Sequence, residues 1–422
     1  MFLSLLAAGA CVDVVTERGE RDPASSDIEP DVIPDDPDAI GDDSGEDPDD
    51  GPDEDDLLFE ALFDLRVVHR VEVELDADDL RLLDESPFSY VEGAAVVEGT
   101  RLERVGVRLK GNNSFQDFSG KPALKLRFDK YLPDQRYAGL KRLTLNNMVG
   151  DPAQSREVVA YHLWNHAGMS APRAAFAQVW INGEDFGLYT MLEPMDSEYV
   201  ERRYEMDEGD LWAANDSAEL TPEGIAHYEL VTGPGGTELE DAAMVLATAA
   251  DDYYETASEV IDMEQFLDYF AWIQLVGTLD GYPYNLNDYF LYADPGDAGR
   301  FDFSPWGLDE AWDPTWTFQW GRRSTVAHQC LLRDSCRALA QQHLDDAVSL
   351  YESADAAGLA DELAALTEEI VVADSRRPWS TSDVRAARAE LWDMLASWGD
   401  VVRRGYWRET PPPPEDTGTA AP

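Results

Sequence analysis

The 422-residue sequence is poor in positive charge and in long apolar runs, and both shortages limit what it can do. It carries 86 Asp and Glu residues against 32 Lys and Arg residues, a formal net charge of −54. A polyanion repels nucleic acids and anionic membranes, which argues against general nucleic-acid binding. No apolar run reaches the roughly 18 residues that cross a bilayer, which excludes a multi-pass membrane protein.

Cysteine is also scarce, with Cys11, Cys330 and Cys336 as the whole set. No pair of histidines stands near these cysteines at the spacing of a zinc finger, so a structural zinc site is not expected. In an exported protein Cys330 and Cys336 are close enough in sequence to close a small disulfide loop, and two buried free thiols are the alternative.

The first 11 residues place a short apolar stretch and several small residues directly before Cys11. This pattern resembles a bacterial lipoprotein signal, in which Cys11 would carry the lipid. The apolar stretch is short and no basic residue precedes it, so an N-terminal segment without a targeting role is the alternative. We expect an exported protein of the bacterial cell envelope or the extracellular space, with no membrane contact beyond this possible anchor.

The acidic residues are concentrated near the N-terminus. Residues 13–56 hold 20 Asp and Glu residues and only two basic residues, Arg18 and Arg21. Such a segment repels itself and buries too little apolar surface to fold, so residues 12–56 are predicted to be a disordered tether. Residues 409–422, which include four consecutive prolines, are predicted to be a second disordered tail. One folded domain is expected over residues 57–408.

The folded region divides into a sheet-rich half and a helical half. Alternating apolar residues predict strands around positions 71–75, 105–109, 123–128 and 143–145, and an Asn182-Gly183 turn predicts a hairpin. A helix is predicted between the N-cap Asp151 and the stop at Gly168. Helices are predicted over residues 263–279 and 337–398, with a short hairpin between them around residues 294–296. The fold class is therefore α+β.

Two acidic islands follow apolar segments in the second half of the domain. Asp280 stands in the first island with Asn285 and Asn287, and Asp309 stands in the second. Carboxylate and amide oxygens suit Mg²⁺ or Mn²⁺. An Asp, then an Asn, then a hairpin and another Asp is the layout of protein kinases. Two ordinary solvated acidic turns are the alternative in so acidic a chain.

The five lysines of the chain all lie within about 30 residues. They are Lys110, Lys121, Lys125, Lys130 and Lys141. A triphosphate is one ligand that would favour compact ammonium groups at this place. Solvated strand faces are the alternative interpretation.

Taken in order, these motifs resemble the spore-coat CotH kinase-like family over roughly residues 65–315. The similarity includes a Gly-Asn-Ser loop, a Lys-Pro pair with a lysine-bearing strand, an Asn-Gly hairpin with Gly-Leu-Tyr and Glu193, and an Asp-Gly, Asn, Tyr-x-x-Tyr loop. The matching stretches are residues 110–114, 121–126, 143–147, 155–157, 182–193, 280–292 and 305–309.

The resemblance implies an atypical protein-kinase-like fold of two lobes that uses ATP and Mg²⁺ or Mn²⁺ to phosphorylate Ser or Thr of a protein substrate at the cell surface. By position, Asp280 becomes the candidate catalytic base, and Asn285 or Asn287 with Asp309 becomes the metal set. Lys125 becomes the phosphate-binding lysine, with Glu157 as its partner. The other candidate nucleotide contacts are Lys110, Asn113, Ser114, Lys121 and Glu193.

One position departs from the family pattern. Where the family has two Asp residues separated by one residue, this chain has Gly307 and then Asp309. Asp309 or Glu310 could supply the missing ligand from a neighbouring position. The alternative is a catalytically inactive kinase-like module with a structural or binding role at the cell surface.

Overall fold

The computed structural model describes residues 53–112, 114–249, 252–313, 316 and 323–408. The predicted lipid anchor, most of the acidic tether, Asn113 and the proline-rich tail lie outside these residues. Helix α1 (Glu54–Leu62) begins a few residues before the predicted domain boundary at residue 57, and the Asp53 side chain caps it by accepting from the Asp56 amide. It packs Phe59 and Leu62 into the interior.

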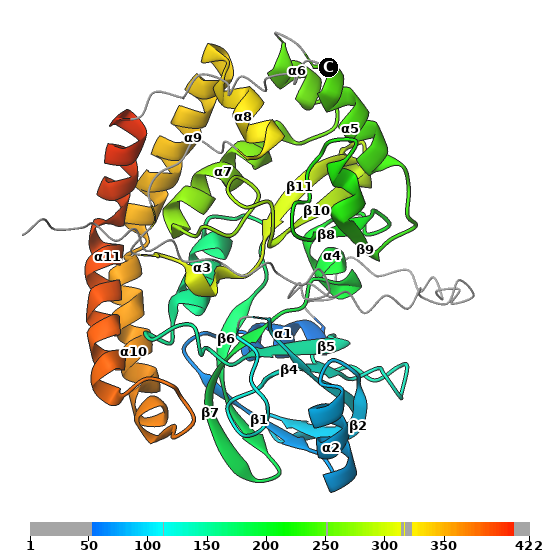
Figure 1. Ribbon diagram of the computed structural model, residues 1–422, viewed down its shortest axis with the longest axis vertical. Coiled ribbons are helices and arrows are strands. Elements are labelled where there is room, and N and C mark those ends of the chain that lie inside the picture. Colours follow the sequence, from blue (N-terminus) through cyan, green and yellow to red (C-terminus); the bar gives the residue numbers. More distant parts are fainter. Residues whose placement is uncertain (1–52, 113, 250–251, 314–315, 317–322, 409–422) are drawn as a thin grey trace, which may run out of the picture.

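The first half of the chain forms a closed barrel, which lies lowest in Figure 1. All neighbouring strands are antiparallel except β1 and β6, which run parallel and close the barrel through the register Val68↔Phe176. Residues that alternate along the strands point inward and form an apolar core of their own. In barrel order the strands are β1 (Val68–Glu74), β2 (Val91–Val97), β3 (Thr100–Lys110), β4 (Ala123–Arg127), β5 (Arg142–Asn146), β7 (Glu184–Leu192) and β6 (Ala174–Ile181).

The β6–β7 hairpin is confirmed, and its turn also joins the barrel closure. Asn182 and Gly183 adopt positive φ angles of 50° and 80°, as the tight turn requires. The Asn182 amide then bonds both backbone groups of Leu75, which follows β1: its Oδ1 accepts from the N–H at 2.8 Å and its Nδ2 donates to the carbonyl at 2.9 Å. The turn residue therefore fixes the end of a strand that lies 107 residues away in sequence.

Helices α2 (Ala77–Glu85) and α3 (Arg156–His166) complete the first half, which holds more helix than expected. The predicted start of α3 directly after an N-cap at Asp151 is wrong, because the helix begins at Arg156. Asp151 is still the capping side chain, since its carboxylate accepts from the amides of Ala153, Ser155 and Arg156. The predicted stop is confirmed: Gly168 has φ +76° just after the end of α3.

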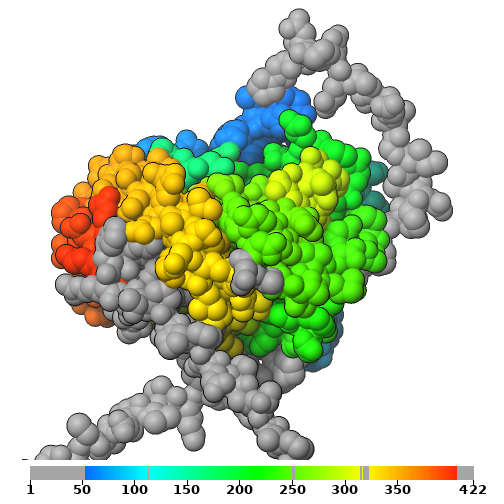
Figure 2. Space-filling view, turned by 90° about the horizontal axis from the view of Figure 1, so that it is seen from above, coloured from blue at the N-terminus to red at the C-terminus, as the bar shows by residue number. Residues whose placement is uncertain are grey.

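The second half is mostly helical, as predicted, and is built around a four-stranded sheet in the order β11-β10-β8-β9. The predicted hairpin at residues 294–296 is β10 and β11. Seen from above in Figure 2, helix α9 lies between the α10–α11 pair, coloured orange to red, and the green region of α5 and α6. The strands are β8 (Leu211–Ala214), β9 (Tyr228–Thr232), β10 (Tyr289–Asp294) and β11 (Arg300–Pro305). The helices are α4 (Ser197–Arg203), α5 (Glu238–Thr248), α6 (Tyr253–Ala257), α7 (Met263–Val276), α8 (Thr325–Leu331), α9 (Asp334–Ser353), α10 (Ala356–Ala373) and α11 (Thr381–Arg408), with 3₁₀ turns η1 (Gly224–His227), η2 (Pro295–Asp297) and η3 (Leu308–Glu310).

Helices α10 and α11 run down one side of the molecule and reach the barrel (Figure 1). Lys121, which precedes β4, forms an ion pair with Asp374, just past α10, and neither side chain is exposed to solvent. Gly187 on β7 makes room for this contact, because a Cβ atom there would lie 2.1 Å from the Asp374 carboxylate. The C-terminal helices are thus joined to the sheet-rich half by a buried ion pair.

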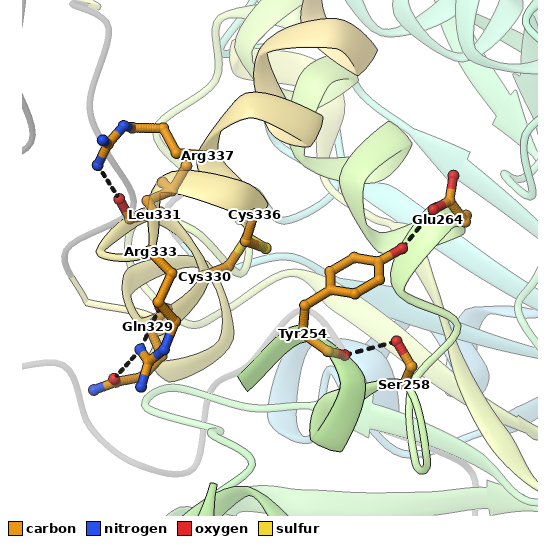
Figure 3. Close-up of a disulfide and its surroundings, with 9 residues drawn as sticks. All are labelled: Tyr254, Ser258, Glu264, Gln329, Cys330, Leu331, Arg333, Cys336 and Arg337. Atoms are coloured by element: carbon orange, nitrogen blue, oxygen red, sulfur yellow. Dashed lines mark hydrogen bonds between the residues drawn. A yellow bond between two sulfur atoms is a disulfide. The ribbon is translucent and has the colours of Figure 1, made fainter. Parts of the chain in front are cut away.

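The predicted disulfide between Cys330 and Cys336 is confirmed, with the two Cα atoms 5.3 Å apart. It joins the end of α8 to the first turn of α9, beside Tyr254 of α6 (Figure 3). Both cysteines are buried. Of the helices in the described part of the chain, none combines the length and apolar character that crossing a membrane requires.

Candidate active site between the barrel and the helical half

The outer face of β3 and β4 carries two of the predicted lysines. Lys110 lies opposite Ala123 and Arg108 lies opposite Lys125 in the antiparallel register, so all four side chains leave the barrel on the same side. Lys110 is buried on this face, whereas Lys125 is half-buried. Helix α3 lies between this half of the molecule and the helices of the second half (Figure 1).

Lys110 is connected to Glu157 of α3 through one asparagine. Its Nζ donates to Oδ1 of Asn146 on β5 at 2.6 Å, and Nδ2 of Asn146 donates to Oε1 of Glu157 at 2.8 Å. Lys110 therefore reaches Glu157 through Asn146. The pairing of Lys125 with Glu157 stays a prediction. The sequence does not distinguish Lys110 from Lys125. The difference arises in the fold, because Lys110 ends β3 and there reaches Asn146.

Glu157 also faces Asp309 of the second acidic island. Burial and then the nearby carboxylate of Asp309 raise the pKa of Glu157, Lys110 lowers it, and the net result is a pKa of about 8. Turn η3, which contains Asp309, packs against α3. A buried carboxylate beside a half-buried one is a place where a cation is stabilising.

Arg156 fixes η3 to the start of α3. Its Nη1 donates to the carbonyls of Ala311 and Trp312, each at 2.6 Å, and its Nε lies 3.4 Å from the Asp151 carboxylate. All of these groups are buried or nearly so. The position of Asp309 relative to Glu157 is therefore set by a buried arginine rather than by a free loop.

The first acidic island is a compact turn after α7. Gly277 ends that helix in the left-handed conformation, and Asn285 then folds back on Asp280. Its Nδ2 donates to the Asp280 carboxylate, and its Oδ1 accepts from the Gly281 amide at 3.0 Å. Both ends of the Asn285 amide are thereby used to hold Asp280.

Asn287 is the better of the two candidate amide ligands. It is 7% exposed, and its Oδ1 has no hydrogen-bond partner among the described residues. A buried acceptor without a donor is costly unless a ligand or water meets it. The oxygen chemistry of Asn287 and Asp309 fits a divalent cation. Within the described residues, three or more His, Cys, Asp or Glu side chains nowhere gather as a complete metal site, so nucleotide oxygens or water would have to complete the set.

Two predicted nucleotide contacts have structural roles instead. Lys121 is wholly buried against Asp374 and is not available to a ligand. Glu193 is 1% exposed, pairs with Arg202 at 2.7 Å and accepts from the backbone of Arg173. Both predictions are corrected, because a motif match shows that a charged residue is needed there but does not show its partner.

The loop between β3 and β4 is held at both ends by Asn147. Its Nδ2 donates to the carbonyl of Ser114 at 3.0 Å and to that of Lys121 at 2.7 Å. Gly111 has φ +109°, and a Cβ there would lie 2.9 Å from the Ser114 hydroxyl. Ser114 is thus held next to Gly111 and Asn147. Asn146 is a site residue that sequence reasoning did not single out, because nothing in the strand pattern shows that it joins Lys110 to Glu157.

Comparison with known proteins identifies the family of the chain. The family described as CotH kinase protein matches residues 107–347. Inner spore coat protein H of Bacillus subtilis (strain 168) is 26% identical over 189 residues, which is 42% of this chain and 51% of that protein. This chain thus matches about half of the length of that relative.

Two solved structures overlap loosely with the fold. The Helicobacter pylori proinflammatory kinase CtkA has a TM-score of 0.33 at 12% identity, covering 68% of this chain and 94% of CtkA. The Shewanella oneidensis MR-1 toxin–antitoxin complex of HipA, HipB and operator DNA has a TM-score of 0.32 at 11% identity, covering 80% of this chain and 74% of the matched one.

Proposed function

The chain belongs to the CotH kinase protein family, and we propose that it transfers the γ-phosphate of ATP to a Ser or Thr hydroxyl of a protein, with Mg²⁺ or Mn²⁺. The observation that carries the proposal is the connected set Lys110–Asn146–Glu157 with Asp309 facing Glu157. A buried lysine, a helix glutamate and an acidic residue from the other half of the molecule are the parts that position a triphosphate in kinases.

Each residue has a defined task in this proposal. Lys110 contacts the phosphates, and Asn146 and Glu157 hold its ammonium group in place. Asp309 and Asn287 offer oxygen ligands to the cation, which when bound neutralises charge on the phosphates. Asn285 keeps the Asp280 carboxylate in one orientation.

The transfer forms one bond and breaks another. The substrate hydroxyl oxygen bonds to the γ-phosphorus, while the bond from that phosphorus to the bridging oxygen breaks and ADP leaves with the electron pair. Asp280 orients the hydroxyl and accepts its proton. Because positioning supplies most of the rate, the loss of this one carboxylate should cost about a hundredfold in turnover.

Export is a further part of the proposal. The disulfide between Cys330 and Cys336 supports it, because such bonds persist mainly in oxidising compartments. A protein at the cell surface is accordingly the proposed substrate, and the lipid anchor at Cys11 remains a proposal as well.

Calorimetry with ATP and Mn²⁺, run beside a phosphate-transfer assay, tests the activity. The unmutated protein should bind and transfer. Asp280→Asn should keep nucleotide affinity and lose turnover, whereas Asp309→Asn should lose metal-dependent affinity. Binding without transfer would favour the inactive module, and no binding at any metal concentration would refute a nucleotide-dependent function.

A further inference from the structure

Gly307 and Asp288 lie side by side at the end of the β10–β11 hairpin. Tyr289 pairs with Pro305 in the antiparallel register, and the Trp306 amide donates to the Asp288 carbonyl at 3.0 Å. A Cβ atom built on Gly307 would lie 3.0 Å from Oδ2 and 3.1 Å from Cγ of Asp288. The carboxylate of Asp288 therefore occupies the space into which a side chain at position 307 would project.

Asp288 and Asp309 face one buried hydroxyl. Tyr161 of α3 is fully buried, close to the carboxylates of Glu157, Asp309 and Asp288. The backbone amide of Gly307 faces the same phenol. Among the described residues, no partner meets the Tyr161 hydroxyl at hydrogen-bonding geometry.

The Tyr161 hydroxyl is thus buried beside carboxylates without a hydrogen bond of good geometry among the described residues. The unpartnered Oδ1 of Asn287, adjacent to Asp288 in sequence, is a second group of the same kind. Native proteins satisfy nearly all buried polar atoms, so exceptions that cluster indicate a missing ligand or water. Carboxylate and amide oxygens are the ligands that a divalent cation takes in proteins.

We propose that Asp288 supplies the carboxylate that position 307 lacks, so that Asp288 and Asp309 together hold the divalent cation of a bound nucleoside triphosphate. This inference rests on the proposed function. The site then has two carboxylates, as the Asp-x-Asp pattern does. One of them, Asp288, comes from just before β10 instead of just after β11. Gly307 is then an adaptation to Asp288 rather than a loss of the site.

The backbone allows the two residues to be exchanged. Asp288 has φ 55° and Gly307 has φ 62°, both in the left-handed region. Glycine adopts that region freely, and Asp is among the side chains that tolerate it. The variant Asp288→Gly/Gly307→Asp therefore keeps the composition and net charge of the protein and removes the close contact between the two positions.

Mn²⁺ uptake by the full-length protein with a non-hydrolysable ATP analogue, followed by electron paramagnetic resonance, tests the inference without an activity readout. Asp288→Asn should weaken Mn²⁺ binding by about tenfold or more, since a charged ligand is replaced by a neutral one of equal size. The exchange variant should recover to within about threefold of the unmutated protein.

Asp302→Asn on β11 is the matched control, because it makes the same charge change in a cluster with Asp262 and Asp294 and should leave Mn²⁺ binding unchanged. Thermal unfolding of each variant identifies any loss of fold. If the unmutated protein takes up no Mn²⁺ with the analogue, the proposed function itself fails. If it does, and Asp288→Asn binds equally well or the folded exchange variant shows no recovery, the role of Asp288 alone is overturned.

Discussion

Nζ of Lys121 lies 2.6 Å from Oδ2 of Asp374, and the two residues are separated by 253 positions in the sequence. Oδ1 of Asp374 also accepts hydrogen bonds from the amides of Arg376 and Arg377, so the carboxylate is held in place independently of the lysine. The pair connects the loop before β4 to the turn between α10 and α11. A buried pair with this degree of hydrogen bonding is stable while intact and costly when half of it is removed.

Lys121→Met should therefore lower the free energy of unfolding by about 3 kcal/mol, because it leaves the Asp374 carboxylate buried without a counter-ion. Chemical denaturation measures the loss. Combining it with Asp374→Asn should restore part of the stability, since the buried charge is then gone while an acceptor remains for the two amides.

The exposed pair Arg66–Glu362 is the control, because it joins the barrel side to α10 with side chains 58% and 52% exposed. Arg66→Met should cost no more than about 1 kcal/mol. Equal losses for the buried and exposed pairs would contradict the account of Lys121.

The second prediction separates Lys110 from Lys125. Lys110→Met and Glu157→Gln should be non-additive in the free energy of unfolding by about 1 kcal/mol, because both act on the chain through Asn146. Lys125→Met and Glu157→Gln should add to within about 0.5 kcal/mol. A double-mutant cycle for each pair gives the answer, and stronger coupling to Lys125 would reverse the assignment.

The third prediction concerns pH. His343 of α9 bonds Asp268 of α7 through Nδ1 at 2.7 Å, and its Nε2 lies 3.3 Å from Glu264. The hydrogen bond to Asp268 raises the pKa of His343 above 6.5. The charged imidazole is thus favoured in the folded state, so its contribution is fully present below about pH 6.5 and is lost as the pH rises through the higher folded pKa.

The melting temperature should show this as a difference between unmutated protein and His343→Gln that is larger near pH 5.5 than near pH 8.5. The expected contribution is about 0.5 kcal/mol, because both acids are partly exposed to solvent. A difference that grows toward alkaline pH would have the wrong sign.

The fourth prediction concerns the disulfide. The Cys330–Cys336 bond closes a short loop between positions six apart in sequence, so its removal should cost about 2 kcal/mol by the chain-entropy relation. Cys330→Ser/Cys336→Ser measured by denaturation tests the magnitude. Thiol titration of the unreduced, denatured protein should detect neither cysteine, and two reactive thiols would count against both the bond and export.

Local patterns were enough for the elements whose causes are local. The Asn182-Gly183 turn, the glycine stop after α3 and the reciprocal caps of Ser380 and Asp383 at the start of α11 depend on residues within a few positions. The parallel closure of β1 on β6 could not be predicted in this way, because it pairs strands about a hundred residues apart and leaves no periodic signal.

The same limit explains the site. Alternation along β4 correctly placed Lys125 on the strand face opposite the apolar residues, but it could not show that Lys110 reaches α3 through Asn146. Lys121 carries the same charge as Lys110, yet its partner comes from the far end of the domain. Asp288 was visible in the sequence only as one acidic residue among many, and its relation to Gly307 exists only in the folded chain.

The ion pair of Lys121 and Asp374 also bears on where this protein can be cut. The segment that matches the family ends at residue 347, before α10 and α11, and begins at residue 107, after β1 and β2. A fragment with those limits would keep Lys121 and discard its counter-ion. It would also open the barrel, because it lacks β1, β2 and residues 100–106 of β3. The segment that matches the family is therefore shorter than the folded unit. Fragments for biochemical work should include all elements from α1 to α11, residues 54–408.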